Sequence, residues 1–466
     1  MTSFDNVCRI PCILYKSVIL FMGKEEQRME IETLKRSHIK RNIIIGVVAV
    51  LIISAIILNF TRAKYRSVAS VPIVNSTVNY ELSDLNTVAV YIQEGEDYTK
   101  TDTIPEEGYT LNQEKSYCKV NDSDINATIN YDTNTKTLSV SPLTTKGTKC
   151  YLYFDEESNA GEQILANYLT KTTRSSFTST VTASSTGTIY YADTSKGRTY
   201  YFAGNPTDNW VSFAGFYWRI IRINEDGSIR LIYNGTGKGT TGTSTQIQTS
   251  AFNSSYNNNM YVGYMYRSNQ VHGLTTDSTI KIELDQWYEE NLQSHADKIS
   301  TEAGFCGDRT STTSSSGAPN DTGGTGTTQT YYGARYRLNT NKTPTFECPD
   351  ADHDLYTVSS ANSGNKALDY PIGLITADEV AYAGGVVGQS NNGYYLYTNQ
   401  YYWTMSPCGF NGSYAGVFSV GSDGSLDNVN GVYWTEPGVR PIINLAPNVI
   451  ITGGNGAVDS PFEIAA

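Results

Sequence analysis

The sequence predicts an α+β head that follows a small all-β sandwich and a single transmembrane helix. Three observations lead to this fold class. One apolar run, Ile43–Leu58, interrupts an otherwise polar chain. Alternation typical of strands, broken by turn residues, fills 72–157, and both strand and helix patterns occur after residue 189.

The apolar run has the length of a bilayer-spanning helix. Together with Asn42, Asn59 and Phe60 it supplies about 20 residues, the number that one crossing requires. No small-residue cleavage site follows it, which favours an uncleaved signal anchor over a removed signal peptide. We therefore expect a transmembrane helix at 42–60 and a single-pass protein of the cell membrane.

Cysteine usage sets the expected orientation, because basic residues flank the run almost evenly. Four of the cysteines beyond the run form two plausible pairs, which is typical of an oxidising compartment. We expect a cytoplasmic tail at 1–41, a stalk at 61–71 and an extracellular C-terminal part. Within the tail, Ile10–Met22 is apolar but too short for a second span, and a misassigned start codon is its simplest explanation.

The segment 72–157 is predicted to be a small β-sandwich. Cys118 and Cys150 fall in adjacent predicted strands, and a disulfide between them contributes about 4 kcal/mol in the chain-entropy model. After it, Ala160–Leu169 has apolar positions at helical spacing, and a Ser/Thr-rich stretch follows. We interpret 158–188 as a linker made of one helix and a connector.

The head is expected at 189–466 and opens with strands. Val211–Ile223 and Ser228–Tyr233 alternate and are rich in aromatic and β-branched residues, and Asn224–Gly227 between them is a hairpin turn.

Two helices are expected in the head. Asp277–Tyr288 opens with capping residues and places apolar residues on one face. The second helix begins at Thr376, which forms a capping box with Glu379, and it ends at Gly384.

A low-complexity insertion at 308–345 separates these two helices, and it is too polar to bury much apolar surface. Cys306 and Cys348 lie on either side of it, and a disulfide between them contributes about 4 kcal/mol in the same model. Cys408 is left over. We expect it to be buried, since an unpaired cysteine packs as a small hydrophobic residue, and a reactive thiol is the alternative.

The end of the chain carries the most specific pattern. Trp403–Pro407, a Gly/Ser/Asn-rich stretch at Gly409–Gly431, and Gly438–Leu445 with its Gly-Val-Arg-Pro sequence follow one another. This pattern resembles the closing core of C-type-lectin-like domains of the formylglycine-generating-enzyme type. It is also similar to bacterial surface proteins of unknown function and to the variable ligand-binding proteins of diversity-generating retroelements. The resemblance covers roughly Thr199–Leu445.

The resemblance implies a mixed domain of short strands, two helices and irregular loops. It also implies a ligand face near the C-terminus. The residues of this chain that match that face are Tyr401, Tyr402, Asn411, Ser413, Tyr414, Asn428, Asn430, Tyr433 and Trp434. Aromatic and short polar residues are typical of recognition surfaces, and the alternative is a loop face that is merely soluble. Trp403 is assigned to the core.

The chain lacks the residues that two known activities of such domains need. Copper-dependent oxidation needs two reactive cysteines close together, and only Cys408 is spare. A calcium-dependent sugar site needs Glu-Pro-Asn and Trp-Asn-Asp, but Glu436 and Pro437 precede a glycine and the second motif is missing. We therefore expect no cofactor.

A calcium loop is the weaker alternative for Asp350, Asp352 and Asp354. These acids alternate along the chain, yet they lack the glycine turn and the distal glutamate of a known calcium loop. A solvated turn is the preferred interpretation.

The composition limits the classes of molecule that the protein is expected to bind. The net charge of −12 argues against nucleic acid, and 35 tyrosines provide many groups that both stack and form hydrogen bonds. His272, His295 and His353 lie in none of the common catalytic motifs. We therefore predict a membrane-anchored cell-surface protein, not an enzyme, that binds an extracellular protein or glycan. The alternative is a cell-envelope hydrolase or oxidase, which would require His272 or His353 to lie beside carboxylates.

Overall fold

The computed structural model describes residues 87–94, 97–105, 109–132, 137–141, 147–156, 158–185, 187–359 and 363–464. The chain divides into an N-terminal unit, which takes in most of the described residues up to Tyr153, and a C-terminal unit, which runs from Phe154 and also includes the segments 92–97 and 106–110.

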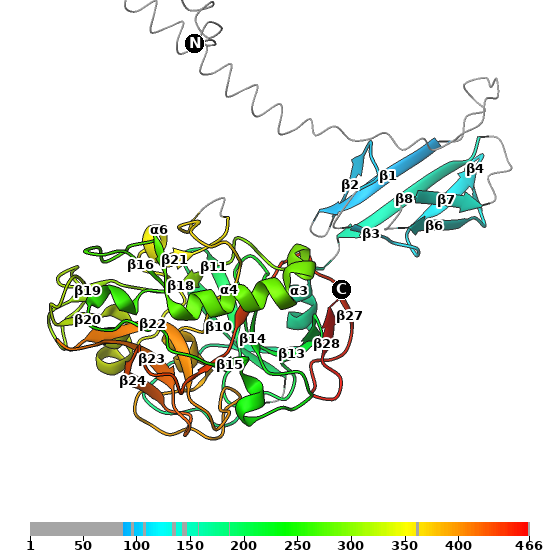
Figure 1. The fold of residues 1–466 in the computed structure, drawn as a ribbon. Helices are drawn as coiled ribbons and strands as arrows, with labels where there is room; N and C mark the ends of the chain where they lie inside the picture. Colours follow the sequence, from blue (N-terminus) through cyan, green and yellow to red (C-terminus); the bar gives the residue numbers. More distant parts are fainter. Residues whose placement is uncertain are drawn as a thin grey trace, which may run out of the picture. The chain divides into compact units, whose positions relative to one another are not determined.

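The N-terminal unit is built from strands alone among its described residues. A six-stranded sheet has the order β2-β1-β8-β4-β5, with β3 also paired to β8, and β6 and β7 form a separate antiparallel pair (Figure 1). The bounds are β1 Thr87–Glu94, β2 Asp97–Thr101, β3 Tyr109–Leu111, β4 Tyr117–Val120, β5 Ser123–Ile125, β6 Thr128–Asp132, β7 Thr137–Ser141 and β8 Lys149–Glu156.

The expected disulfide of this unit is confirmed. Cys118 on β4 lies directly opposite Cys150 on β8, and the two are bonded. Both side chains are buried beside Leu152, so the disulfide lies in the small core of the sheet.

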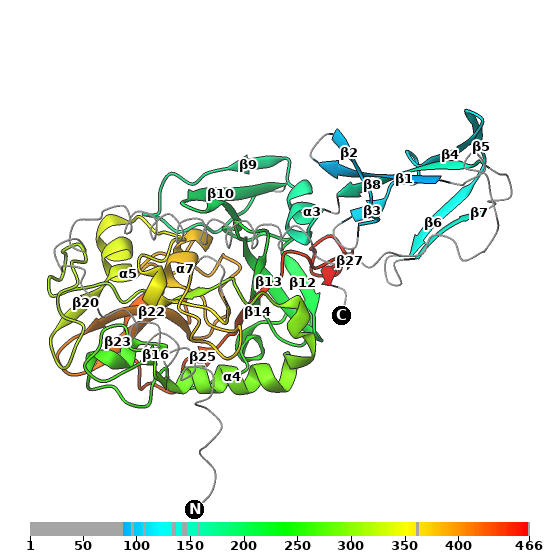
Figure 2. The same cartoon turned by 90° about the horizontal axis from the view of Figure 1, so that it is seen from above.

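The C-terminal unit contains two larger sheets that share one core (Figures 1 and 2). The nine-stranded sheet has the order β27-β28-β12-β13-β11-β10-β9, with β14 between β13 and β26. Its bounds are β9 Thr170–Thr172, β10 Thr188–Thr194, β11 Gly197–Tyr201, β12 Trp210–Phe213, β13 Phe216–Ile223, β14 Ile229–Tyr233, β26 Ile442–Leu445, β27 Ile451–Gly453 and β28 Phe462–Ile464.

The seven-stranded sheet has the order β15-β25-β22-β20-β19, with β23 between β22 and β24. Its bounds are β15 Gln248–Thr249, β19 Ser311–Thr312, β20 Thr330–Tyr332, β22 Tyr402–Phe410, β23 Ala415–Val420, β24 Leu426–Gly431 and β25 Gly438–Val439. Two short ladders pair β16 (Met265–Tyr266) with β17 (Thr276–Asp277) and β18 (Phe305–Cys306) with β21 (Leu355–Tyr356).

The helices of the C-terminal unit are short. In Figure 2, α4 lies along one side of the unit, and α5 and α7 lie on the other. Their bounds are α3 Ala160–Ala166, α4 Thr279–Asn291, α5 Gly333–Arg335, α6 Ala351–Asp354 and α7 Ala377–Ala383, with 3₁₀ turns at Gly242–Thr245, Asn259–Val262 and Gln293–Lys298 and a π-helical turn at Tyr336–Asn341.

Arg440 marks the point where the chain passes from one sheet to the other, between β25 and β26. Its side chain is fully buried. The guanidinium donates to the carbonyl of Tyr233 at 3.0 Å and lies over the ring of Tyr402, 4.8 Å from its centroid. The arginine of the Gly-Val-Arg-Pro sequence is therefore a structural group that joins the two sheets.

The capped helices are confirmed at their starts. Thr376 and Glu379 form the expected capping box of α7, and Gly384 ends this helix with a φ of 117°. Ser278 caps α4 through a hydrogen bond from the backbone N–H of Lys281, and Ile280 and Leu284 are fully buried.

Two local expectations need correction. The single strand expected at Val211–Ile223 is two strands, β12 and β13, because Ala214 and Gly215 both have positive φ and turn the chain back. The insertion 308–345 is part of the folded unit. Its strand β20 pairs with β22 and carries the buried Tyr332, and its residue Leu338 lies in the core.

The segment expected to be a linker belongs to the C-terminal unit. Helix α3 packs Ile164 into the core, β9 pairs with β10, and Arg174 donates to the carbonyls of Ala381 and Tyr382. The structural unit therefore begins near Phe154 and not at residue 189.

The fold class predicted from the sequence is wrong. The described chain is mostly β, with about 35% strand and 15% helix, and even α4 has only 13 residues. The helical patterns mark only a few turns each, so they do not make an α+β head.

The structure does not support the expected single-pass membrane topology. Among the described residues, no helix has both the length and the apolar character that a membrane crossing requires. The span expected at 42–60, the tail at 1–41 and the stalk at 61–71 lie outside the described residues.

Candidate functional site

Exposed aromatic side chains gather where the loops around β22, β23 and β24 meet. Tyr256, Tyr433 and Trp434 are 45%, 39% and 41% exposed. The ring of Tyr433 lies 4.6 Å from that of Tyr256 and 6.0 Å from that of Tyr414, centroid to centroid. We call Tyr256, Tyr414, Tyr433 and Trp434 the aromatic surface.

Two backbone features hold this surface in place. The side-chain oxygen of Asn411 accepts hydrogen bonds from the N–H groups of Ser413 and Tyr414, at 2.9 and 3.0 Å, and so fixes the β22–β23 turn. Gly431 lies under the rings, because a Cβ there would come within 2.6 Å of Tyr433 and 3.2 Å of Tyr414. Preorganised rings lose little conformational freedom when they bind a partner.

The residues predicted for the ligand face divide into exposed and buried ones in the structure. Tyr414, Tyr433 and Trp434 belong to the aromatic surface, and Asn411 and Ser413 lie beside it. Tyr401, directly before β22, is 41% exposed. The side chain of Asn428 lies outside the described residues.

Tyr402 and Asn430 do not belong to the ligand face. Tyr402 is fully buried, its hydroxyl donates to the carbonyl of Leu396 at 2.9 Å, and burial raises its pKa to about 12. Asn430 is buried and donates its side-chain amide to the hydroxyl of Ser419. Trp403 lies in the core, as predicted, with its indole N–H bonded to the carbonyl of Ser250 at 2.7 Å.

Tyr256 was not predicted as a site residue. It lies in an Asn/Ser-rich stretch, far in the sequence from the C-terminal pattern. The fold places it in the aromatic surface, where its carbonyl accepts a hydrogen bond from the N–H of Ala415 at 2.7 Å. The one signal in the sequence was a large aromatic residue among small polar ones.

The cysteines of the C-terminal unit are arranged as predicted. Cys306 and Cys348 form a disulfide, and Cys408 is buried. Burial raises the pKa of the Cys408 thiol to about 11, against the opposing effect of Arg335, whose Nη1 lies 3.8 Å from the sulfur. A protonated, buried thiol is a poor nucleophile.

We expect Cys408 to resist alkylation in the folded protein. Iodoacetamide at mildly alkaline pH should leave it unmodified, as read by peptide mass spectrometry, whereas the same reagent should modify it once the chain is unfolded in denaturant. Alkylation of the native protein at the rate of a free thiol would contradict the buried, protonated state.

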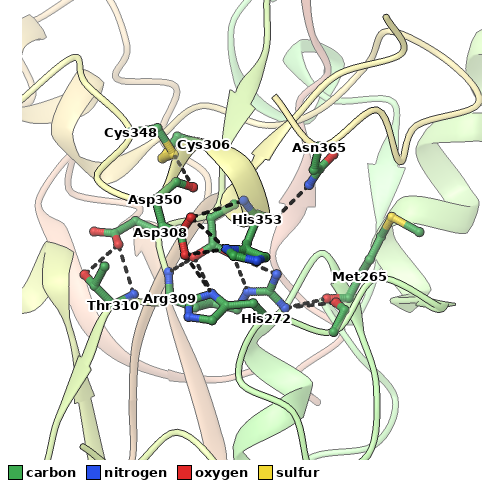
Figure 3. A network of polar contacts seen from close by, with 12 residues as sticks. Met265, His272, Cys306, Asp308, Arg309, Thr310, Cys348, Asp350, His353 and Asn365 are labelled. Carbon is green, nitrogen blue, oxygen red and sulfur yellow. Dashed lines mark hydrogen bonds and ion pairs between the residues drawn. A yellow bond between two sulfur atoms is a disulfide. The ribbon is translucent and has the colours of Figure 1, made fainter. Parts of the chain in front are cut away.

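A second cluster joins His272 and His353 to two carboxylates (Figure 3). Nδ1 of His272 lies 3.1 Å from Asp354 and 3.7 Å from Asp350, and Nδ1 of His353 lies 2.9 Å from both oxygens of Asp350. Arg309 pairs with the fully buried Asp354 through its Nε at 2.8 Å and its Nη2 at 2.7 Å.

The charges of this cluster shift its pKa values in opposite directions. Burial alone raises the pKa of Asp354, but Arg309 and then His272 outweigh it, so the pKa lies below its usual range. Burial alone lowers the pKa of His272, but the hydrogen bond to Asp354 outweighs it, and the pKa is raised. Asp352, the third of the alternating acids, is exposed and lies outside the cluster.

A polar cavity of about 530 Å³ lies beside the Cys306–Cys348 disulfide. Cys348, Phe346 and Gly304 line it, together with Lys196 and Glu347.

Arg222 borders this cavity and belongs to a buried network of charges behind it. Glu379 forms an ion pair with Arg230, whose Nε lies 2.5 Å away, and accepts a hydrogen bond from Nε of Arg222 at 3.2 Å. Arg337 pairs in the same way with Asp308 and Asp378, at 2.6 and 2.9 Å. The network therefore holds three arginines against three carboxylates.

No family model, curated protein or solved structure matches this chain. The resemblance to C-type-lectin-like domains therefore stays an expectation from the sequence.

Proposed function

We propose that the C-terminal unit is a recognition module that binds a protein or glycan ligand through the aromatic surface. The observation that carries the proposal is the group of rings in which Tyr433 packs against Tyr256 and Tyr414 over Gly431, with the exposed Trp434 next to it in the chain. Rings of this kind provide contact area at low entropic cost, and tyrosine and tryptophan dominate the binding energy of protein surfaces.

The neighbouring polar groups support the same proposal. Asn411 and Ser413 are exposed beside the rings, and the turn that carries them is fixed by its own hydrogen bonds. An aromatic centre with adaptable amide and hydroxyl groups around it is the arrangement that paratope-like surfaces use.

A second candidate, an enzyme on this scaffold, is favoured by one observation, the approach of His272 and His353 to carboxylates. The pairing of Asp354 with Arg309 weighs against it. A carboxylate with a lowered pKa is a weak base at neutral pH, so the imidazole of His272 would have to act alone.

Truncation of two rings is expected to weaken binding strongly. We expect the full chain to bind selected members of protein and glycan arrays. The double variant Tyr433→Ala, Trp434→Ala should bind the same ligand about 1000-fold more weakly, because central aromatic residues each contribute about 2 kcal/mol or more.

Tyr117→Ala is the matched control, since Tyr117 is a similarly exposed tyrosine (36%) of the N-terminal unit. Circular dichroism and thermal melting show whether each variant is folded. Binding that survives the double substitution in the folded protein, or that the control abolishes equally, would contradict the proposed surface.

A further inference from the structure

A separate group of side chains has the arrangement of a metal site. His272, from the loop between β16 and β17, meets Asp350 and Asp354 at the two ends of α6. One ligand atom from each lies within 4.8 Å of the others. We propose that His272, Asp350 and Asp354 bind a divalent transition-metal ion of the Zn²⁺ type.

The distances from His272 to the two carboxylates fit this ion. Around a tetrahedral zinc at about 2.0–2.1 Å, neighbouring ligand atoms lie roughly 3.3 Å apart. Nδ1 of His272 lies 3.1 Å from the Asp354 oxygen and 3.7 Å from the Asp350 oxygen, on either side of that value. The oxygens of Asp350 and Asp354 lie within 4.8 Å of each other, so movement of the partly exposed His272 and Asp350 toward the fixed Asp354 would bring the three atoms around the ion.

The chemistry of the donors selects the class of ion. One imidazole nitrogen and two carboxylate oxygens suit zinc and its neighbours. Calcium prefers six to eight oxygen ligands, and Asp352, which a calcium loop would use, lies outside the group. Three protein ligands leave a fourth position for water or for a group of a bound molecule.

The surroundings hold the three ligands without closing the site. Arg309 engages Asp354 through its backbone N–H at 2.5 Å and through its guanidinium, and His353 approaches Asp350 (Figure 3). His272 and Asp350 keep 23% and 25% of their side chains exposed, so an ion can enter from solvent. Groups that orient ligands in this way raise metal affinity.

The position of α6 is fixed as well. Cys348, two residues before Asp350, is bonded to Cys306, and β18 pairs with β21 directly after Asp354. The three ligands are therefore held near one another before the ion arrives, and the ion takes the place of the proton between His272 and Asp354.

The test uses Zn²⁺ alone with the full chain, freed of any affinity tag. Calorimetric titration should show one site in the micromolar range that His272→Gln and Asp350→Asn each weaken at least about tenfold, a loss typical of changes around metal ligands. Zinc should also raise the melting temperature of the wild type but not of these variants.

Asp352→Asn is the matched control, because it removes an exposed carboxylate of the same helix that lies outside the group. It should leave zinc affinity unchanged. The proposal fails if the wild type shows no zinc site that His272→Gln removes, or if Asp352→Asn weakens binding as much as Asp350→Asn. His272 and Asp350 are partly exposed, so both variants are expected to fold, and the melting curves verify this.

Discussion

Replacing Glu379 with alanine is expected to lower the free energy of unfolding by about 3–5 kcal/mol. The substitution leaves Arg230 buried without its partner, and an uncompensated buried charge costs that much. It also removes the acceptor for the N–H of Thr376, at 2.9 Å, and so half of the capping box of α7. Chemical denaturation measures the change.

The effect of the Glu379 charge on stability can be separated from the effect of its packing by varying the pH. Burial alone raises the pKa of Glu379, but Arg230 and Arg222 outweigh it, so the folded pKa lies below the usual range. The carboxylate therefore stabilises the fold at neutral pH, and its contribution is lost as pH falls below about 4 through the folded pKa. The advantage of the wild type over Glu379→Gln should shrink in that range.

Glu225→Ala is the control for this prediction. Glu225 faces Arg222 at 3.8 Å and is more exposed than Glu379, so its loss should cost less than about 1 kcal/mol. Equal costs for Glu225→Ala and Glu379→Ala would contradict the buried network.

Removing the Cys306–Cys348 disulfide is expected to cost about 4 kcal/mol in the chain-entropy model, because the bond closes a loop with a sequence separation of 42. The double variant Cys306→Ser, Cys348→Ser should unfold at lower denaturant concentration. It should also weaken the zinc site, since the bond fixes the chain just before Asp350.

The second disulfide provides the comparison. Cys118→Ser with Cys150→Ser alters the N-terminal unit, so it should destabilise that unit and leave the unfolding of the C-terminal unit unchanged. A C-terminal transition that moves equally in both double variants would show that the loop at 306–348 is not held by its own disulfide.

Local signals in the sequence predicted local structure well. The capping box at Thr376 and the turn at Asn224–Gly227 appear where expected, because they depend on a few neighbouring residues. The turn at Ala214 was missed, since its alanine carries no preference for positive φ.

Long-range pairing was the part that the sequence did not predict. Polar segments such as Ser311–Thr312 become strands because β20 supplies a hydrogen-bonding edge that composition does not indicate. The helices of the head, by contrast, form close to where they were expected, but strands outweigh them in the described chain, so the predicted fold class was wrong.

The candidate site was predicted in part. Loop residues such as Tyr433 and Trp434 are exposed as expected, whereas Tyr402 is buried because nearly every residue of β22 is covered on both faces. A strand covered on both faces shows no alternation, so the sequence could not indicate which side chains point inward. Tyr256 and the approach of His272 to Asp354 depend on contacts between distant segments.

Hydroxyl-radical footprinting of the full chain with and without its ligand tests the proposed recognition surface most directly. We predict that Tyr256, Tyr414, Tyr433 and Trp434 become protected from oxidation when the ligand binds, while Tyr117 reacts at the same rate. Protection of Phe346 at the polar cavity instead, with the four rings unchanged, would contradict recognition through the aromatic surface.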